Sequence, residues 1–230
     1  MYRRKFIQNI VLLALISPFI KLNASTNKKI VVVGAGIVGT SIAYELSNLG
    51  IKTILIDKYK AGSGTSNSSF NWINATYPKK PYSYNYLAQL GIKAFKDIQN
   101  DLNYDIQWNG SLEWVNSKKS QKELIDEVKK LMQYQTFTKH KIINYKKANI
   151  LENKLDFRNN INIVHSEEDG VIETNEFIRL LIDRIHFNGS KVLEECEFES
   201  IKYTNNTISS IITSKGEIAT DQIVLSLIHI

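Results

Sequence analysis

Residues 28–58 of this chain read KKIVVVGAGIVGTSIAYELSNLGIKTILIDK, and this stretch decides the fold. Its first apolar run, residues 30–33, is unbroken, which is typical of a parallel strand covered on both faces. Three glycines spaced G-x-G-x-x-G follow, Gly50 is placed to end a helix, and residues 53–56 form a second apolar run. Between them, apolar residues recur at helical spacing at Val38, Ile42, Leu46 and Leu49. The stretch predicts a βαβ unit, and therefore an α/β fold built on a parallel sheet.

Each glycine of the motif has a physical role in binding a dinucleotide. Gly34 allows a tight strand-to-helix turn, Gly36 lets the backbone approach a pyrophosphate, and Gly39 lets the helix pack closely on the strand. The helix N-terminus then offers N–H groups and partial positive charge to phosphate. Asp57 ends the second strand, where a carboxylate can accept hydrogen bonds from a ribose diol. The acid disfavours a 2′-phosphate, so NADP does not fit, whereas NAD and FAD both do.

The segment after the second strand favours FAD. An NAD-binding domain usually returns through a helix to a third parallel strand, but this chain enters the Ser- and Thr-rich sequence GSGTSNSSFNWINA, residues 62–75. Together with the βαβ unit, this segment resembles the D-amino acid oxidase-like (DAO) family of FAD-dependent oxidoreductases, which includes glycine and sarcosine oxidases and D-amino acid dehydrogenases. The resemblance runs from about Lys28 to Leu225.

The resemblance implies a discontinuous Rossmann-type FAD-binding domain, made of a parallel sheet with a β-meander, and an inserted, incomplete α+β substrate domain. We expect the FAD-binding domain at residues 28–80 and 165–230, and part of the substrate domain at residues 81–164. Within the first of these, the strand that begins near Lys191 joins the parallel sheet. Turns at Asn205-Asn206 and Lys215-Gly216 separate the strands of the meander.

The resemblance also implies which residues contact FAD. Thr65 and Ser66 donate hydrogen bonds to the cofactor, Phe198 contacts the adenine side through its backbone, and residues 69–72 lie near the isoalloxazine or the substrate. For Phe70 and Trp72 in this last stretch, ordinary core packing is the alternative. The full expected cofactor-binding set is Gly34, Ala35, Gly36, Ile37, Val38, Gly39, Asp57, Lys58, Thr65, Ser66 and Phe198.

In the family, an amine substrate loses its Cα–H as a hydride to flavin N5, and the resulting imine hydrolyses. Reduced FAD then passes electrons to oxygen or to a membrane carrier. Because the flavin performs the redox step, little acid–base work by side chains is needed, and no catalytic residue is assigned here. Two other functions stay open at this point: an NAD-dependent dehydrogenase built on the same βαβ unit, and a non-catalytic nucleotide-binding remnant.

Three further segments predict local structure. Residues 81–102 and 120–134 have amphipathic helical patterns, and residues 105–115 alternate around Asn109-Gly110 like a β-hairpin. The helical faces expected to be buried are Leu87, Leu90, Ala94, Phe95, Ile98 and Leu102 in the first, and Leu124, Val128, Leu131 and Met132 in the second. A third helix begins near Thr174, turns Phe177, Leu181 and Ile185 inward, and ends at Gly189.

The end of the sequence departs from the family pattern. Residues 218–226 resemble the strand that returns to the parallel sheet, but residues 227–230 replace the glycine turn that family members place against FAD. Family members also continue substantially further, through the usual carboxylate-binding Arg and Tyr. We therefore interpret the chain as an incomplete family member: a fragment, a frameshifted product or half of a split protein.

Composition excludes several other classes. The net charge of +6 comes mainly from dispersed Lys residues, without the arginine-rich or basic–aromatic arrays of nucleic-acid-binding proteins. The single cysteine, Cys196, excludes an internal disulfide and a CxxC metal site, and the four His residues have no metal-ligand spacing.

Residues 1–25 predict an export signal. A basic start that includes Arg3 and Arg4 precedes an apolar segment ending before Lys21, which is short for a membrane span and typical of a signal peptide. The paired arginines resemble the bacterial twin-arginine signal, which exports folded, cofactor-loaded proteins. We expect export to a bacterial periplasm; the alternative is an inner-membrane anchor formed by residues 6–20.

Overall fold

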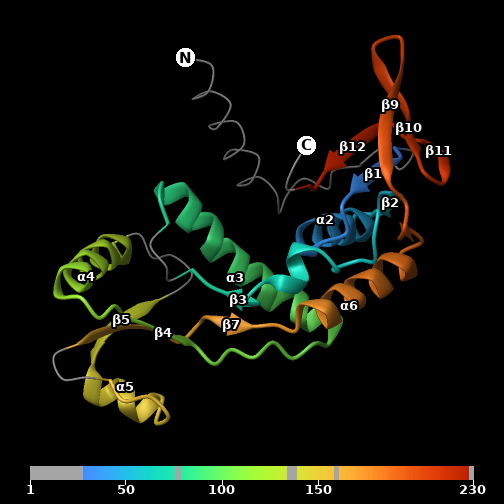
Figure 1. Ribbon diagram of the computed structural model, residues 1–230. Helices are drawn as coiled ribbons and strands as arrows, with labels where there is room; N and C mark the ends of the chain where they lie inside the picture. The colour runs from blue at the N-terminus through green and yellow to red at the C-terminus, as the bar shows by residue number, and fades with distance from the viewer. Residues whose placement is uncertain (1–27, 76–78, 134–138, 158–160, 228–230) are drawn as a thin grey trace. The chain divides into compact units, whose positions relative to one another are not determined.

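The computed structural model describes residues 28–75, 79–133, 139–157 and 161–227 (Figure 1). These residues divide into two compact units: one runs up to Lys60 and resumes at Ile185, and the other comprises residues 61–184. The predicted export signal, residues 1–25, lies outside the described residues. In the part of the chain that is described, no helix combines the length and the apolar character needed to cross a membrane.

The first unit contains a parallel sheet and a meander. Its elements are β1 (Ile30–Val33), α2 (Ile37–Asn48), β2 (Thr53–Ile56), β8 (Lys191–Leu193), β9 (Phe198–Thr204), β10 (Thr207–Thr213), β11 (Gly216–Ala219) and β12 (Gln222–Leu225). The parallel strands are ordered β12-β1-β2-β8, and the antiparallel strands β11-β10-β9. The predicted βαβ unit, the meander and the strand that returns to the sheet are therefore confirmed.

The core of this unit lies between the parallel sheet and the meander. Val31, Val33 and Ile56 of the sheet cluster with Ile211 of β10 and with Cys196, and all five are buried. The meander turns are those that the sequence predicts, because Asn205 and Asn206 have φ values of 52° and 59° and Gly216 has 111°. Positive φ at both central residues is the type I′ requirement of a two-residue hairpin.

Helix α2 is where the sequence predicts it, but its buried face is not the row of large apolar residues that recurs at helical spacing. The buried residues are Gly39, Thr40, Ala43, Tyr44 and Ser47, most of them small. Of the apolar residues that recur at helical spacing, Val38 is 62% and Leu49 68% exposed. The repeat correctly predicts the helix, but the face that packs on the strand consists mainly of small residues.

The second unit holds two antiparallel sheets and most of the helices (Figure 1). Its elements are the 3₁₀ helix η1 (Thr65–Ser68), β3 (Trp72–Ile73), α3 (Tyr82–Leu102), β4 (Ser111–Glu113), α4 (Lys118–Met132), β5 (His140–Asn144), α5 (Tyr145–Leu151), β6 (Asn162–Ser166), β7 (Gly170–Val171) and α6 (Thr174–Phe187), the last of which continues into the first unit. The sheets are β4-β6-β5 and β3-β7.

Helix α4 packs on the three-stranded sheet through the expected Leu124 and Val128 and also through Ile125, which the predicted face did not include. Leu124, Ile125 and Val128 are buried against Val164 of β6, whereas Met132 is 39% exposed. Ser117 caps this helix by accepting a hydrogen bond from the Ser120 N–H at 3.1 Å. In α6, the expected residues Phe177, Leu181 and Ile185 are all fully buried, and Gly189 follows the helix with φ of 78°.

The predicted hairpin around Asn109-Gly110 was wrong. Strand β4 pairs with β6, and Gln107 forms a bridge with Val171 instead of pairing across the turn. Gly110 has φ of 77°, and a Cβ there would lie 2.5 Å from the Ser166 carbonyl oxygen. Gly110 is therefore needed because its backbone packs closely against β6. The local turn pattern does not reveal this distant strand.

The buried face of α3 also differs from the prediction. Asn85, Gln89 and Ile92 are buried, whereas Leu87 is 61% exposed. The two amides are satisfied internally: Asn85 Nδ2 donates to the Ala75 carbonyl at 3.0 Å, and Gln89 Nε2 donates to Asn85 Oδ1 at 2.9 Å. Hydrogen-bonded polar side chains on a helix cannot be recognised from apolar periodicity.

The compact units divide the chain at other positions than the expected domains. Residues 61–80 and 165–184 belong to the second unit, whereas the expected domains assign both to FAD binding. The reason is their pairing: β3 pairs with β7, and Asn175 Nδ2 of α6 donates to Asn67 Oδ1 of η1 at 2.6 Å. The Ser-rich segment thus packs on α6 and β7.

Candidate nucleotide-binding site

Two of the three motif glycines are required by the packing of the chain itself. Gly34 has φ of 104°, and a Cβ there would lie 2.3 Å from the carbonyl oxygen of Ser226, which follows β12. At Gly39 a Cβ would lie 1.9 Å from the Gly34 carbonyl oxygen. Because real Cβ atoms do not approach backbone oxygens this closely, both positions need glycine before any ligand is considered.

Gly36 differs from the other two glycines. It precedes the first turn of α2 with φ of −74° and ψ of 179°, an extended conformation that any residue adopts. Among the described residues, no side chain caps α2 at this position, and its first turn contains no acidic residue. No carboxylate within the first turn of α2 therefore neutralises the positive end of the helix, which suits an anionic ligand.

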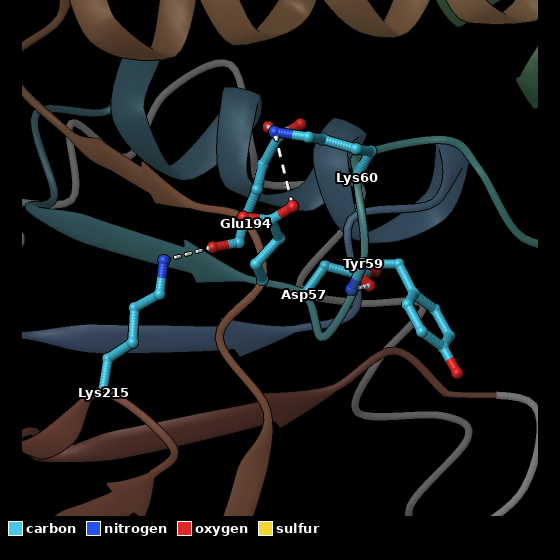
Figure 2. Close-up of polar contacts among 6 residues, drawn as sticks. Asp57, Tyr59, Lys60, Glu194 and Lys215 are labelled. Atoms are coloured by element: carbon cyan, nitrogen blue, oxygen red, sulfur yellow. Dashed lines mark hydrogen bonds and ion pairs between the residues drawn. The ribbon is translucent and has the colours of Figure 1, made fainter.

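The carboxylate of Asp57 lies at this turn and is engaged by the backbone on both oxygens. Oδ2 accepts a hydrogen bond from the Ala35 N–H at 2.7 Å, and Oδ1 accepts one from the Tyr59 N–H at 2.8 Å. Ala35 is fully buried, and Asp57 is half-buried. The Asp57 side chain thus joins the end of β2 to the glycine turn. Figure 2 shows the Asp57 side chain beside Tyr59.

The chain beyond β2 is held against the chain beyond β8. The Cys196 N–H donates to the Asp57 carbonyl at 2.8 Å, and the Glu195 N–H donates to the Tyr59 carbonyl at 3.2 Å. Lys60 Nζ lies 3.2 Å from Glu194 Oε2, and Lys215 Nζ donates to the Glu194 carbonyl at 2.8 Å (Figure 2). The hydrogen bond to Glu194, with its negative charge, raises the pKa of Lys60.

The other expected cofactor residues of the first unit are Lys58, Phe198, Ile37 and Val38. Lys58 is exposed, and its Nζ lies 5.0 Å from the centre of the Tyr59 ring. Phe198 begins β9, pairs with Thr213, and packs its half-buried side chain against the core cluster. Ile37 and Val38 are the first two residues of α2.

Thr65 and Ser66 belong to the second unit, so they lie in a different compact unit from the glycine turn and Asp57. They are the first residues of η1, which buries none of its side chains. The segment is anchored at Gly62, where a Cβ would lie 3.0 Å from Asn175 Oδ1 and 3.1 Å from Ile178 Cδ1. The predicted cofactor residues thus fall in both units, and the assignment of Thr65 and Ser66 to FAD stays a prediction.

Phe70 and Trp72 are not core residues among the described parts of the chain. Phe70 is 95% and Trp72 39% exposed. Phe70 borders a surface hollow of about 640 Å³ within the second unit, lined also by Asn71, Asn103, Tyr104, Asp105, Gln107, Val171, Ile172, Glu173, Glu176 and Leu180. Core packing, the alternative for Phe70, was therefore wrong.

The sequence interpretation missed a buried carboxylate that organises the second unit. Asp169 is fully buried; its Oδ2 accepts from Ser111 Oγ at 2.6 Å, and its Oδ1 accepts from Ser166 Oγ at 3.1 Å and from the Ala75 N–H at 3.4 Å. Its own carbonyl accepts from the Gly110 N–H at 2.9 Å. The sequence indicated only a turn at Asp169-Gly170, and no local pattern names its distant partners.

Asp169 also affects titratable groups packed near it. Burial, and secondarily the negative charge of Asp169, raise the pKa of Glu113, whose Oε2 is buried without a hydrogen-bond partner among the described residues. Burial lowers the pKa of Lys79 and of His140, and the same negative charge opposes both shifts. None of these groups is adjacent to the glycine turn in the sequence.

Comparison with known proteins identifies the family. The model of the DAO family, described as FAD dependent oxidoreductase, matches residues 29–227. The chain belongs to the DAO family. A curated relative, a probable sarcosine oxidase of Arabidopsis thaliana, is 31% identical over 81 residues, which cover 34% of this chain and 19% of that protein.

Solved structures share the fold across most of the chain. The L-proline dehydrogenase of P. horikoshii matches with a TM-score of 0.78 and 24% identity, covering 86% of this chain and 52% of that one. The glycine oxidase of Bacillus cereus matches with a TM-score of 0.74 and 20% identity, covering 86% and 55%. The L-amino acid deaminase of Proteus vulgaris matches with a TM-score of 0.76 and 20% identity, covering 87% and 47%. The chain thus spans about half the length of these solved relatives.

FAD is the cofactor of the DAO family, and the residues of the first unit fit its phosphate and adenosine parts. The first turn of α2 contains no acidic residue, so the positive end of the helix is available to an anion. The backbone conformation of Gly36 does not itself require glycine. Asp57 places a carboxylate beside this turn. The donor set suits an anionic group flanked by a diol, which is the chemistry of an adenosine diphosphate.

Proposed function

We propose that this protein is an FAD-dependent oxidoreductase that oxidises an amino acid or a related amine. The observation that carries the proposal is Gly36, which is extended at an uncapped helix start, inside a chain of the DAO family. The neighbouring structures support the substrate class, since they are named proline dehydrogenase, glycine oxidase and L-amino acid deaminase.

In this proposal the residues of the chain bind and orient, and the flavin performs the redox step. When bound, FAD supplies the acceptor, at N5, for the hydride that leaves the amine Cα. The backbone from Gly34 to Gly39 would hold the pyrophosphate against the start of α2, and Asp57 would accept hydrogen bonds from the ribose. Thr65 and Ser66 would donate hydrogen bonds to the cofactor.

The two described arginines after residue 28 are not proposed as ligands of a substrate carboxylate. Arg179 lies 3.3 Å from Asp183 on α6, and Arg184 donates to the Asp101 carbonyl at 2.6 Å. Both guanidinium groups thus take part in contacts within the second unit.

A reconstitution experiment tests the function. The full chain is incubated with FAD, dialysed, and examined for retained flavin absorption in the visible range. The loaded protein is then mixed anaerobically with glycine, sarcosine, proline and D-alanine in turn. We expect retained FAD and bleaching of the flavin by at least one amine. Retention of NAD instead of FAD would support the dehydrogenase alternative, and retention of FAD without bleaching by any amine would support the non-catalytic one.

We also propose that residues 1–25 direct export of the folded protein to a periplasm by a twin-arginine route. The physical reason is that a protein loaded with FAD in the cytoplasm has to cross the membrane already folded. Lys in place of Arg3 and Arg4 keeps the positive charge but removes the paired guanidinium groups.

A reporter that is active only when exported folded tests this route. It is fused to residues 1–30, with and without Arg3→Lys and Arg4→Lys. We expect the double variant to block export. Equal export from both fusions would indicate the general secretory route, and a reporter retained in the membrane fraction would indicate an anchor formed by residues 6–20.

A further inference from the structure

We infer that Asp57 positions the phosphate-binding turn itself, so that the turn is arranged before any nucleotide binds. This role rests on the proposed function, since it concerns how the same site holds an adenosine diphosphate group. It is distinct from a contact between the carboxylate and ribose, because its direct partners are backbone groups of the protein. Asp57 is in this sense a positioning residue.

The geometry that carries the inference is the use of both carboxylate oxygens. The Ala35 N–H is 2.7 Å from Oδ2 and the Tyr59 N–H is 2.8 Å from Oδ1. Both distances lie at the short end of the range for N–H···O hydrogen bonds. The Ala35 residue is fully buried, so without Asp57 its N–H would lose a partner that water does not readily replace.

The position of Ala35 makes this hydrogen bond important for the turn. Ala35 lies between Gly34, which has φ of 104°, and Gly36, which is extended at the start of α2. Glycines on both sides leave the backbone with a wide choice of conformations. A charged hydrogen bond to the residue between them fixes the peptide planes that a pyrophosphate would approach.

The same carboxylate can still bind ribose. An ionised carboxylate has about four lone-pair sites, and two are used here. Ribose contact and turn positioning therefore share one side chain, and removing Asp57 should weaken even a nucleotide that has no ribose hydroxyl groups. That consequence separates the two roles.

The test compares ADP with 2′,3′-dideoxy-ADP by titration calorimetry on the full chain. If Asp57 positions the turn, Asp57→Ala weakens the binding of both nucleotides by about 10-fold or more, and Asp57→Asn has a smaller effect on both. If the affinity for the dideoxy nucleotide is unchanged while that for ADP falls, Asp57 acts on ribose alone and the inference is overturned. Binding of neither nucleotide by the unsubstituted chain would overturn the proposed function, and this role in binding with it.

A measurement without nucleotide separates this inference from the proposed function. In the nucleotide-free chain, Asp57→Ala should speed amide hydrogen exchange at Ala35 and Tyr59 by about 10-fold or more and leave the amides of β1 unchanged. Unaltered exchange at Ala35 would overturn the positioning role whatever the nucleotide data show.

The chain offers a matched control at the other end of β1. Asp221 Oδ2 accepts a hydrogen bond from the Lys29 N–H at 2.8 Å, which is again a carboxylate bound to a backbone amide beside the same strand. Asp221→Ala should speed exchange at Lys29 and leave the affinities for both nucleotides unchanged. If Asp221→Ala also weakened nucleotide binding, the effect of Asp57→Ala would be explained by a general loss of stability. That result would overturn the inference.

Discussion

The two units fix their backbones by different means. In the first unit, the turn between β1 and α2 is constrained by two glycines of one short motif, and the close approach at Gly39 is to the carbonyl of Gly34 in the same motif. In the second unit, the buried carboxylate of Asp169 joins Ala75, Ser111 and Ser166, which lie far from one another in the sequence. This difference explains why the structure of the first unit can be predicted from its sequence, whereas that of the second unit can be predicted only in part.

The strongest test of this contrast removes the carboxylate. Asp169→Ala should lower the free energy of unfolding of the second unit by about 3 kcal/mol, because three donors lose a charged acceptor. Urea unfolding followed by exchange of the β4 and β6 amides measures the loss. The control is Asp183→Ala on α6, whose side chain is 62% exposed and whose removal should change stability by less than about 0.5 kcal/mol. Equal losses in the two variants would contradict the organising role of Asp169.

A second substitution tests the close approach in the first unit. Gly39→Ala should destabilise that unit by about 2 kcal/mol, because its new Cβ would meet the Gly34 carbonyl and force α2 away from β1. Gly64→Ala is the matched control, because a Cβ there has no atom within 4 Å among the described residues. Thermal unfolding of both variants measures the difference, and similar melting temperatures would refute the packing argument.

Gly36 should behave differently from its neighbours in the motif. Because its conformation is open to any residue, Gly36→Val should leave the melting temperature of the FAD-free chain nearly unchanged. Its branched side chain should nevertheless obstruct the pyrophosphate and weaken FAD binding by about 100-fold or more. Dialysis against FAD and thermal unfolding measure the two effects. Normal flavin content in a folded variant would contradict the assignment of the site.

The smallest expected effect is a change in pH dependence. Burial and the charge of Asp169 raise the pKa of Glu113, so the folded state prefers the protonated acid. The stability that this group contributes is complete below its unfolded pKa near 4.5 and is lost as pH rises through the higher folded pKa. Glu113→Gln should flatten this part of the stability curve and stabilise the chain at neutral pH. Urea midpoints measured from pH 4 upward, at about one-unit steps, provide the comparison; an unchanged slope would contradict the burial effect.

The sequence was sufficient wherever neighbouring residues determine the structure. The βαβ motif, the Asn205-Asn206 turn and the Ser117–Met132 helix region follow from local spacing and turn chemistry. Prediction failed where the partner is distant. The Asn109-Gly110 pattern is chemically a turn, but Gly110 packs against β6 and not against the strand before it.

The candidate site divides in the same way. The glycine turn and Asp57 could be placed from the sequence because strand, helix and acid follow one another at fixed spacing. The sequence could not predict that both Asp57 oxygens accept hydrogen bonds from backbone N–H groups, because these partners depend on the folded path of residues 57–59. Thr65 and Ser66 were assigned by resemblance alone, and their membership of the second unit follows from contacts with α6.

The position of β12 beside β1 has a consequence for biosynthesis. Lys29 and Asp221 are 192 residues apart in the chain, yet they are hydrogen-bonded at the start of β1, and the Ser226 N–H closes the other end by donating to the Val33 carbonyl at 2.8 Å. A ribosome that adds about 5–20 residues per second needs about 10–40 s to cover that distance. During this interval the glycine turn is already outside the ribosome but lacks the strand against which Gly34 packs. The glycine turn is therefore completed only when β12 has been synthesised. Until then, β1 and β2 are accessible to chaperones and proteases.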